Sequence, residues 1–288
     1  MQTMRIMLRD SSIKWLMVSS LLSLASAANC SRALLQEGID RYIAAQSTGQ
    51  VQWLGNVLDI NVTYLENGKI VDISDSTLSK SIRVDRSHSI YDFTQCATFT
   101  ELIATDPISP WVIGAQIWHN SSKISKIDRI LTTTDDWLFN SSHTLHYTLL
   151  EDWGEIPLME RDSRETIQAA GDAYLDVFKN TSLPVPWGSP CVRLEGGAYT
   201  GRGLSNDTCN VGIPPGFNYT NPNRRYVIDD SVGVVSILLE FGSIGNAPDS
   251  HEFRVEKGKL RYIHTMTYCE KKPNCGYDRP PMDQDVGF

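Results

Sequence analysis

Two histidines near the C-terminal end of the chain are well suited to proton transfer. His251 and His264 lie in successive stretches that alternate apolar and polar residues, a pattern typical of β-strands. If the turn between these strands centres on Lys257-Gly258, the two histidines pair at the same level and both face the interior of the fold. Imidazole titrates near neutral pH, so such a pair could act as a general acid and base. A purely structural role remains open for each histidine.

Arg193 and Glu195 offer a second pair of polar groups. They are two residues apart on a predicted strand, so their side chains point the same way and should form an ion pair. That pair could brace the glycine-rich stretch 196–203 or polarise a substrate carbonyl. The stretch lacks the Lys-Ser/Thr and the helix of a phosphate-binding loop. The spacings of metal and dinucleotide sites are also missing, so we expect no metal and no cofactor.

Large aromatic side chains are the candidates for binding an apolar substrate. We expect the hydrogen-bond donors to be in the second half of the chain, with an apolar platform that includes Trp187 and Phe253. The positions 136 residues upstream of His251 and His264 hold Ala115 and Asp128, so the histidine pair occurs only once. The predicted substrate-binding residues are Trp53, Tyr64, Trp111, Trp118, Trp187, Tyr199 and Phe253.

An internal repeat organises the chain. Residues 113–134 share their pattern with residues 251–269, at an offset of 136. Two upstream blocks recur in the same order, 64–68 with 193–197 and 40–43 with 172–175. We therefore predict a duplicated unit of roughly 120 residues. The repeat also aligns Asp92 with Asp230, and such carboxylates more often brace a structure than catalyse.

The first residues are typical of a secretory signal peptide, with Arg5, Arg9 and Lys14 before an apolar run of about ten residues that ends at Ala25-Ser26-Ala27. That run is too short to cross a bilayer, which needs about 20 residues. The predicted segments are a signal peptide at 1–27, a first unit at 28–137, a connector at 138–161, a second unit at 162–270 and a tail at 271–288.

Six cysteines behind a signal peptide predict disulfides in an oxidising compartment. Proximity favours Cys191–Cys209 and Cys269–Cys275, which leaves Cys30–Cys96. Seven Asn-x-Ser/Thr sequons occur, and Asn29 adjoins the cleavage site. The predicted N-glycosylation sites, each of which must face solvent, are Asn61, Asn120, Asn140, Asn180, Asn206 and Asn218.

The net charge of −8 becomes −10 when the signal peptide, whose charge is +2, is removed. An acidic chain of this kind repels nucleic acid and anionic membranes. We expect apolar small molecules and N-linked glycans as partners, and no membrane span. Whether the chain forms a homodimer stays open.

Local patterns predict the main elements. An amphipathic helix covers Ser31 to Ser47 and ends at Gly49, and a second helix starts at an Asp162 N-cap. A hairpin at 61–73 turns at Asn67-Gly68. Residues 87–103 contain one strand-like segment. The stretch 184–209 replaces the hairpin in the second unit with a disulfide-closed excursion, and the aromatic residues of the connector indicate that it packs against the fold.

A helix, a short helix, a hairpin and long final strands resemble the nuclear transport factor 2-like superfamily, including the SnoaL-like polyketide cyclases. This resemblance implies an α+β fold of two fused cone-shaped units, each a curved, mostly antiparallel sheet with packed helices. In that superfamily the helices close one side of the sheet, and the cone holds a small apolar molecule.

The mature chain also resembles a fungal secreted family long catalogued as a domain of unknown function. The residues that carry this resemblance are 186–188, Cys191, 193–201, 224–229, 249–251 and 253–256. Glycosylated enzymes of fungal tropolone-sesquiterpenoid pathways belong to that family and look like intermolecular hetero-Diels-Alderases. The resemblance implies cofactor-free [4+2] cycloaddition of a tropolone quinone methide with a sesquiterpene such as humulene.

We therefore expect a secretory-pathway enzyme of secondary metabolism that works as a cofactor-independent pericyclase or cyclase. Its catalytic groups are predicted to be His251, His264, Arg193 and Glu195. The alternative is a non-catalytic secreted binder of an apolar molecule, or a cell-surface interaction protein. A large cavity lined by tryptophan would favour the enzyme, and a cone filled by its own side chains would favour the binder.

Overall fold

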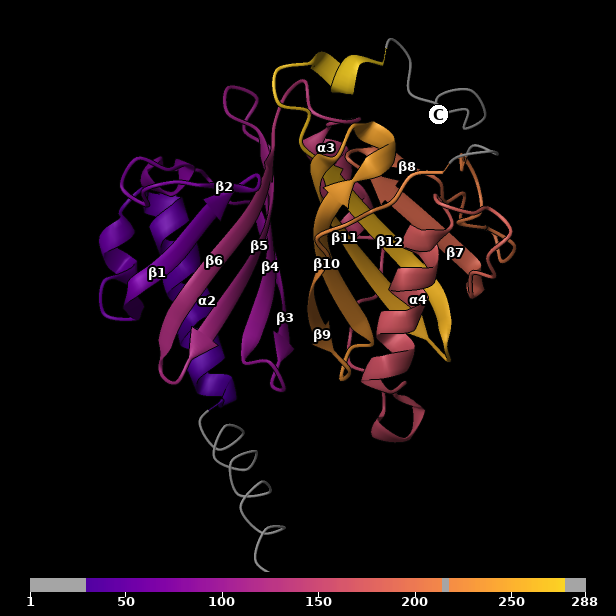
Figure 1. Ribbon diagram of the computed structural model, residues 1–288, viewed down its shortest axis with the longest axis horizontal. Coiled ribbons are helices and arrows are strands. Elements are labelled where there is room, and N and C mark those ends of the chain that lie inside the picture. The colour runs from indigo at the N-terminus through magenta and orange to yellow at the C-terminus, as the bar shows by residue number, and fades with distance from the viewer. Residues whose placement is uncertain (1–29, 214–217, 278–288) are drawn as a thin grey trace, which may run out of the picture.

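The computed structural model describes residues 30–213 and 218–277. The predicted signal peptide and most of the predicted tail lie outside these residues. The fold is α+β and consists of two similar units that occupy the two halves of Figure 1. Each unit contributes one six-stranded sheet and one long helix. No helix in the described part of the chain is long and apolar enough to cross a bilayer.

The two sheets have the same strand order. In the first, the order is β2-β1-β6-β5-β4-β3, and in the second it is β8-β7-β12-β11-β10-β9. In both, the first strand runs parallel to the last, and the other pairings are antiparallel. The strands of the first sheet are β1 (Leu58–Glu66), β2 (Lys69–Ile70), β3 (Arg86–Asp92), β4 (Ala97–Ala104), β5 (Trp111–Asn120) and β6 (Lys123–Thr132). Those of the second are β7 (Trp187–Glu195), β8 (Ala198–Tyr199), β9 (Arg225–Asp229), β10 (Val234–Phe241), β11 (Ala247–Glu256) and β12 (Lys259–Thr267).

The predicted duplication is confirmed at this level. β5 and β11 start 136 residues apart, as do β6 and β12. Two local expectations were wrong. Residues 87–103 form two strands, β3 and β4, joined by a turn. The second unit also keeps its hairpin, because β7 and β8 pair across Gly196 and Gly197 within the loop that the Cys191–Cys209 disulfide closes.

The helices start and end where local hydrogen bonding allows. Helix α2 (Arg32–Thr48) is capped by the Ser31 side chain and ends at Gly49, whose φ of 68° suits glycine. Helix α4 (Arg164–Asp176) is capped by Ser163 and not, as predicted, by Asp162. Asp162 instead accepts a hydrogen bond from the Gly258 amide at 2.8 Å, so it holds the β11–β12 turn.

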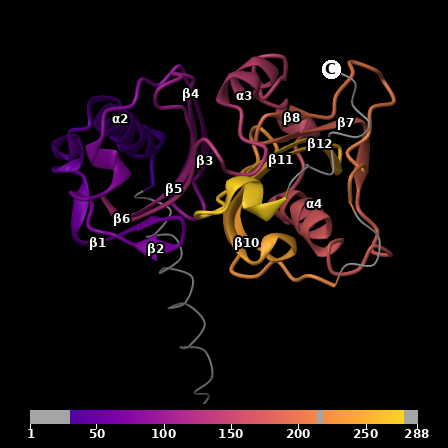
Figure 2. The ribbon, with the colours of Figure 1, turned by 90° about the horizontal axis from the view of Figure 1, so that it is seen from above.

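The two sheets pack face to face, with α2 and α4 on their outer faces (Figures 1 and 2). We call the layer between the sheets the seam. Each unit has its own apolar core beneath its helix, and a third cluster fills the seam with residues of both sheets. The seam cluster comprises Ile90, Ala97, Phe99, Ile103, Val112, Ile130, Trp153, Val192, Val227, Val234, Leu238, Tyr262 and Met266.

The connector crosses the seam as a packed segment, as predicted from its aromatic residues. It contains the short helix α3 (Ser141–Thr148), and Trp153 is buried. The three disulfides join the predicted pairs: Cys30–Cys96, Cys191–Cys209 and Cys269–Cys275. All six predicted glycosylation sites are exposed, and their occupancy stays a prediction.

Two aspartates fix the seam by reciprocal contacts. Asp92 closes the β3–β4 turn and accepts a hydrogen bond from the Ile228 amide of the other unit at 2.9 Å. Asp229, which ends β9, accepts one from the Tyr91 amide at 2.8 Å. Such an exchange is the mark of a twofold-related interface. The structural equivalent of Asp92 is therefore Asp229, and the predicted alignment with Asp230 was wrong by one residue.

Loss of either aspartate should weaken the seam. Asp92 also binds Arg164 at 2.8 Å, so we expect Asp92→Asn to lower the free energy of unfolding by about 1–3 kcal/mol. Urea unfolding followed by circular dichroism measures this change. Asp230→Asn is the matched control, because this neighbouring aspartate is exposed. Equal stability of the two variants would contradict the bracing role.

Candidate functional site

The two predicted catalytic histidines do not form a pair. Near the turn β11 and β12 pair as expected, with Glu256 opposite Lys259. A β-bulge at Arg261 then shifts the register by one residue, so that His264 pairs with Glu252 and not with His251. Because side chains alternate between the faces of a sheet, this shift places the histidines on opposite faces. His251 lies in the second cone, and His264 lies in the seam.

His251, Arg193 and Glu195 do gather inside the second cone. Arg193 lies 3.4 Å from Glu195, as the predicted ion pair, and donates to the hydroxyl of Tyr174 at 3.2 Å. The Nδ1 of His251 lies 2.5 Å from Asp249. Burial raises the pKa of Tyr174 to about 12. The two groups adjoin under helix α4, where the rings of Tyr174 and His251 have centroids 5.6 Å apart.

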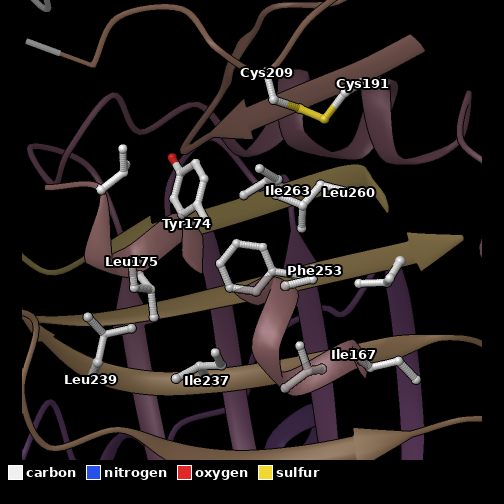
Figure 3. Packing of buried hydrophobic residues seen from close by; sticks show 14 of the residues in the cluster. Ile167, Tyr174, Leu175, Cys191, Cys209, Ile237, Leu239, Phe253, Leu260 and Ile263 are labelled. Carbon is white, nitrogen blue, oxygen red and sulfur yellow. A yellow bond between two sulfur atoms is a disulfide. The ribbon is translucent and has the colours of Figure 1, made fainter. Parts of the chain in front are cut away.

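These groups are sealed by packing. Figure 3 shows the interior of the second unit filled by side chains of α4 and the sheet, among them Tyr174 and Phe253, whose ring centroids are 5.3 Å apart. His251 is 2% exposed and Arg193 is 1% exposed. The predicted apolar pocket inside this cone is therefore occupied by the protein's own side chains.

The first cone contains a similar network. Arg129, which is fully buried, lies 3.1 Å from Glu66 and also binds the hydroxyl of Tyr64. Glu66 is the repeat equivalent of Glu195, but the arginine here comes from β6, whereas Arg193 comes from β7. An arginine–glutamate–tyrosine network that occurs in both units is best explained as bracing of the fold.

The predicted substrate-binding aromatics do not form one site. Tyr64 lies in the first cone, and Trp187 and Phe253 both contact Tyr174 in the second. Trp111 packs against the core of the first cone, to which Tyr64 belongs, and also lines a groove. The other three are elsewhere: Trp118 and Tyr199 at the seam, and Trp53 on the surface with 46% exposure.

The seam contains a cluster of acids and histidines that the sequence had not indicated, apart from His264. β3 and β4 contribute the cross-strand pair His88 and Glu101, and β11 and β12 contribute Glu252 and His264. The two glutamates and His264 are at most 4% exposed. We call these four residues, together with Glu151 of the connector, the acid–histidine cluster.

Glu151 completes the cluster from outside the sheets. Its carboxylate lies 2.5 Å from Nε2 of His264, and the same oxygen accepts a hydrogen bond from the indole of Trp153 at 2.9 Å. The ring of Trp153 in turn packs edge-on against His264, with centroids 4.7 Å apart. Two connector residues, Glu151 and Trp153, therefore fix the orientation of the His264 ring.

The cluster holds protons tightly. Burial alone would lower the pKa of His264, but the carboxylates of Glu151, Glu101 and Glu252 outweigh it and raise that pKa to about 9. Burial also raises the pKa of Glu101 above its ordinary value, and Glu252 adds to this effect. At neutral pH the cluster therefore holds a charged imidazolium next to a carboxyl group whose pKa is raised by burial.

Some polar atoms of the cluster have unused hydrogen-bonding capacity. Nε2 of His88 and Oε1 of Glu252 are 3.6 Å apart, and neither has a hydrogen-bond partner among the described residues. Nδ1 of His264 is buried without a partner in the same part of the chain. Such groups are costly in a protein interior and could instead meet a polar group of a ligand.

The repeat provides an internal comparison. At equivalent places in the register, Arg225 and Leu238 replace His88 and Glu101, and Gln116 and Asp128 replace Glu252 and His264. There, one oxygen of Asp128 binds Arg225 at 2.8 Å and Lys126 at 2.9 Å, an ordinary ion-pair arrangement. The acid–histidine arrangement therefore occurs on one side of the seam only.

One residue of the cluster, Glu101, stands out once the burial of its strand is known. The strand Ala97–Ala104 is buried along its whole length, and Glu101 is its only charged residue. At the equivalent place in the register of the second sheet, the residue is Leu238. A charge that interrupts a buried strand in one copy but not in the other is a good indicator of a special role.

The stability of the protein should depend on pH through His264. Its folded-state pKa of about 9 lies above the value of about 6.5 in unfolded chains. The charged ring therefore stabilises the fold fully below pH ~6.5, and this contribution is lost as the pH rises through about 9. The free energy of unfolding should fall by an amount on the order of 3 kcal/mol over this range, and His264→Gln should remove that fall. Urea titrations at pH 6 and pH 9.5 measure this change. If the free energy of unfolding fell equally with pH in the wild type and in His264→Gln, the assignment would be contradicted.

Part of the chain is similar to known proteins. Residues 160–267 match a family described as "Domain of unknown function (DUF8021)". No curated protein matches. Among solved structures, a Rhodopseudomonas palustris protein named "Putative Isomerase" is similar to 38% of this chain and covers 90% of its own length, with 16% identity and a TM-score of 0.24.

Proposed function

We propose that the protein is a cofactor-independent enzyme that uses the acid–histidine cluster for proton transfer to an apolar small molecule. The observation that supports this most directly is the pair of Glu151 and His264, 2.5 Å apart, beside the buried carboxyl group of Glu101. Buried groups with strongly shifted pKa values are common at catalytic sites, because catalysis needs an acid and a base at the same pH.

The specific reaction that we propose is the hetero-Diels–Alder addition of a tropolone quinone methide to a sesquiterpene such as humulene. A hydroxymethyl tropolone would supply the quinone methide by losing water. The acid of the cluster gives a proton to the leaving hydroxyl as the carbon–oxygen bond breaks, and a carboxylate takes the proton of the ring hydroxyl. One proton is given and one is taken, so no oxidant or reductant is required.

The cycloaddition itself needs little chemical machinery. One carbon–carbon and one carbon–oxygen bond form together, and no group leaves. An enzyme accelerates such a step by holding both partners in a dry place and by donating a hydrogen bond to the oxygen of the heterodiene. In the cluster, the imidazolium of His264 is the candidate donor, and Trp153 and Tyr262 offer aromatic surface, with ring centroids 5.4 Å apart.

A second candidate function follows from the filled second cone. Its interior contains Tyr174 and Phe253 where a ligand was expected (Figure 3). This observation favours the alternative of a secreted, non-catalytic protein that acts through its surface. The two proposals differ in what they require of the seam, since only the enzyme needs the acid–histidine cluster.

Substitutions in the cluster should separate the two proposals. His264→Gln and Glu151→Gln should each lower the rate of cycloadduct formation by about 10- to 1000-fold, as expected for loss of one proton-transfer group or donor. The assay mixes the protein with a hydroxymethyl tropolone and humulene and follows the adduct by mass spectrometry.

Asp128→Asn is the matched control, because Asp128 occupies the position equivalent to that of His264 on the other side of the seam. It should keep the wild-type rate once its thermal stability has been checked. If His264→Gln is folded and equally active, the cluster is not the site. If the wild-type protein forms no adduct, the non-catalytic proposal is favoured.

A further inference from the structure

The two sides of the seam are covered differently. On one side a groove of about 580 Å³ is open, and its lining includes Lys126, Asp128 and Arg225. On the other side, the equivalent positions belong to Tyr262, His264 and His88. There the connector crosses the seam, and α3 lies between β4 and β8 (Figure 2). We call residues 139–155 the strap.

The strap is attached to the fold at its two ends. Just before it, the carbonyl of Leu138 accepts a hydrogen bond from the Gly197 amide at 2.8 Å. Just after it, the amide of Ile156 donates to the carbonyl of Ser231 at 2.8 Å. None of the strand pairings of the described residues includes a strap residue, so the strap is not part of either sheet.

Between these ends, a few contacts hold the strap over the cluster. The ring of Tyr147 stacks on Tyr199 with centroids 4.2 Å apart, and Glu151 binds His264. Thr144 donates to the carbonyl of Gly196. Trp153 adds to them as a member of the seam cluster, and Arg254 donates to the carbonyl of Gly154 at 2.7 Å. None of these contacts is part of a strand ladder, so they can break while the strands keep their pairing.

Two apolar side chains of the strap are exposed next to the cluster. Leu149 and Leu150 immediately precede Glu151 and are 66% and 65% exposed. An apolar molecule that approaches the seam from this side meets two leucines before it meets the buried carboxylate. These two leucines are the apolar surface that such a ligand would contact on this side of the seam.

We propose that the strap is a lid that opens between Leu138 and Ile156 to admit an apolar small molecule to the acid–histidine cluster, with the contact between Glu151 and His264 as its latch. The open groove on the opposite side of the seam shows how much space this architecture leaves when no segment covers it. This inference relies on the proposed function for the location of the site. Opening removes Glu151 from His264, so the catalytic pair is complete only when the lid is closed over its ligand.

Amide hydrogen exchange tests the lid in the intact protein. In the wild type, amides of α3 and residues 149–153 should exchange at least about 10-fold faster than those of β12, because local opening exposes them without global unfolding. Glu151→Gln should speed exchange of the strap by a further ~10-fold or more and leave β12 unchanged, because it removes the charge from the latch. Glu160→Gln is the control, since Glu160 belongs to the same connector but pairs with Lys257 at the surface.

A cross-link gives an independent test. Tyr147→Cys with Tyr199→Cys places two thiols where the stacked rings meet, and a short bis-maleimide would join the strap to the hairpin of β7 and β8. After cross-linking, the amides of the strap should no longer exchange fast. An apolar quencher should also no longer reduce the fluorescence of Trp153, in comparison with the same variant before cross-linking.

The outcomes distinguish this inference from the proposed function. Strap amides that exchange as slowly as those of β12, and that Glu151→Gln does not accelerate, would overturn the lid even if His264→Gln abolished catalysis. Fast, latch-dependent exchange in a protein whose His264→Gln variant is fully active would support the lid and place the chemistry elsewhere.

Discussion

The seam between the two sheets is the constraint on which the rest of the structure depends. Each sheet has one face covered by its own helix, α2 or α4, and an uncovered second face would expose a broad apolar surface to water. Packing the two free faces together buries residues such as Phe99 and Leu238 completely. Each such side chain contributes about 1.5–3 kcal/mol relative to exposure. The reciprocal bonds of Asp92 and Asp229 then determine how the faces align.

A seam made by one chain differs from the interface of a homodimer. In a twofold dimer every interface residue occurs twice, so a reactive cluster on one side must be repeated on the other. In the fused chain the two sides are independent. One side therefore has Asp128 with Arg225, and the other has His264 with Glu151, although the strands that bear Asp128 and His264 are equivalent. A single connector can also cover only one side, which makes the asymmetry complete.

Much of the fold could be predicted from the sequence, because repeated strands and disulfide pairs leave local patterns. The faces of the last hairpin could not be predicted from the turn alone. The bulges at Ser125 and Arg261 each insert one residue, and this single residue reverses the face of everything beyond it. The spacing of apolar residues does indicate the second bulge, since the core residues Leu260 and Ile263 are three positions apart, whereas an unbroken strand would place them two or four apart.

The candidate site was harder to predict than the fold, for a physical reason. Arg193, Glu195 and His251 looked reactive because polar residues inside a predicted cone suggest a pocket. Polar groups in a filled core can equally brace it, and the first cone shows that bracing with Arg129 and Glu66. The acid–histidine cluster depends on which faces of two distant sheets meet and on where the connector crosses them. No local pattern determines either.

The cost of the cluster is itself an argument for its role. Burying carboxylates is unfavourable, and an apolar replacement of similar shape is often equally stable or more stable. This protein contains that replacement: Leu238, at the place equivalent to Glu101, is buried without difficulty in the same seam. Packing therefore does not require a glutamate at position 101, and an ordinary ion pair like that of Asp128 and Arg225 would have satisfied the neighbouring charges. The more costly arrangement lies on the side covered by the strap, which is where the proposed function requires a proton-transfer group, and the less costly side has an ion pair instead.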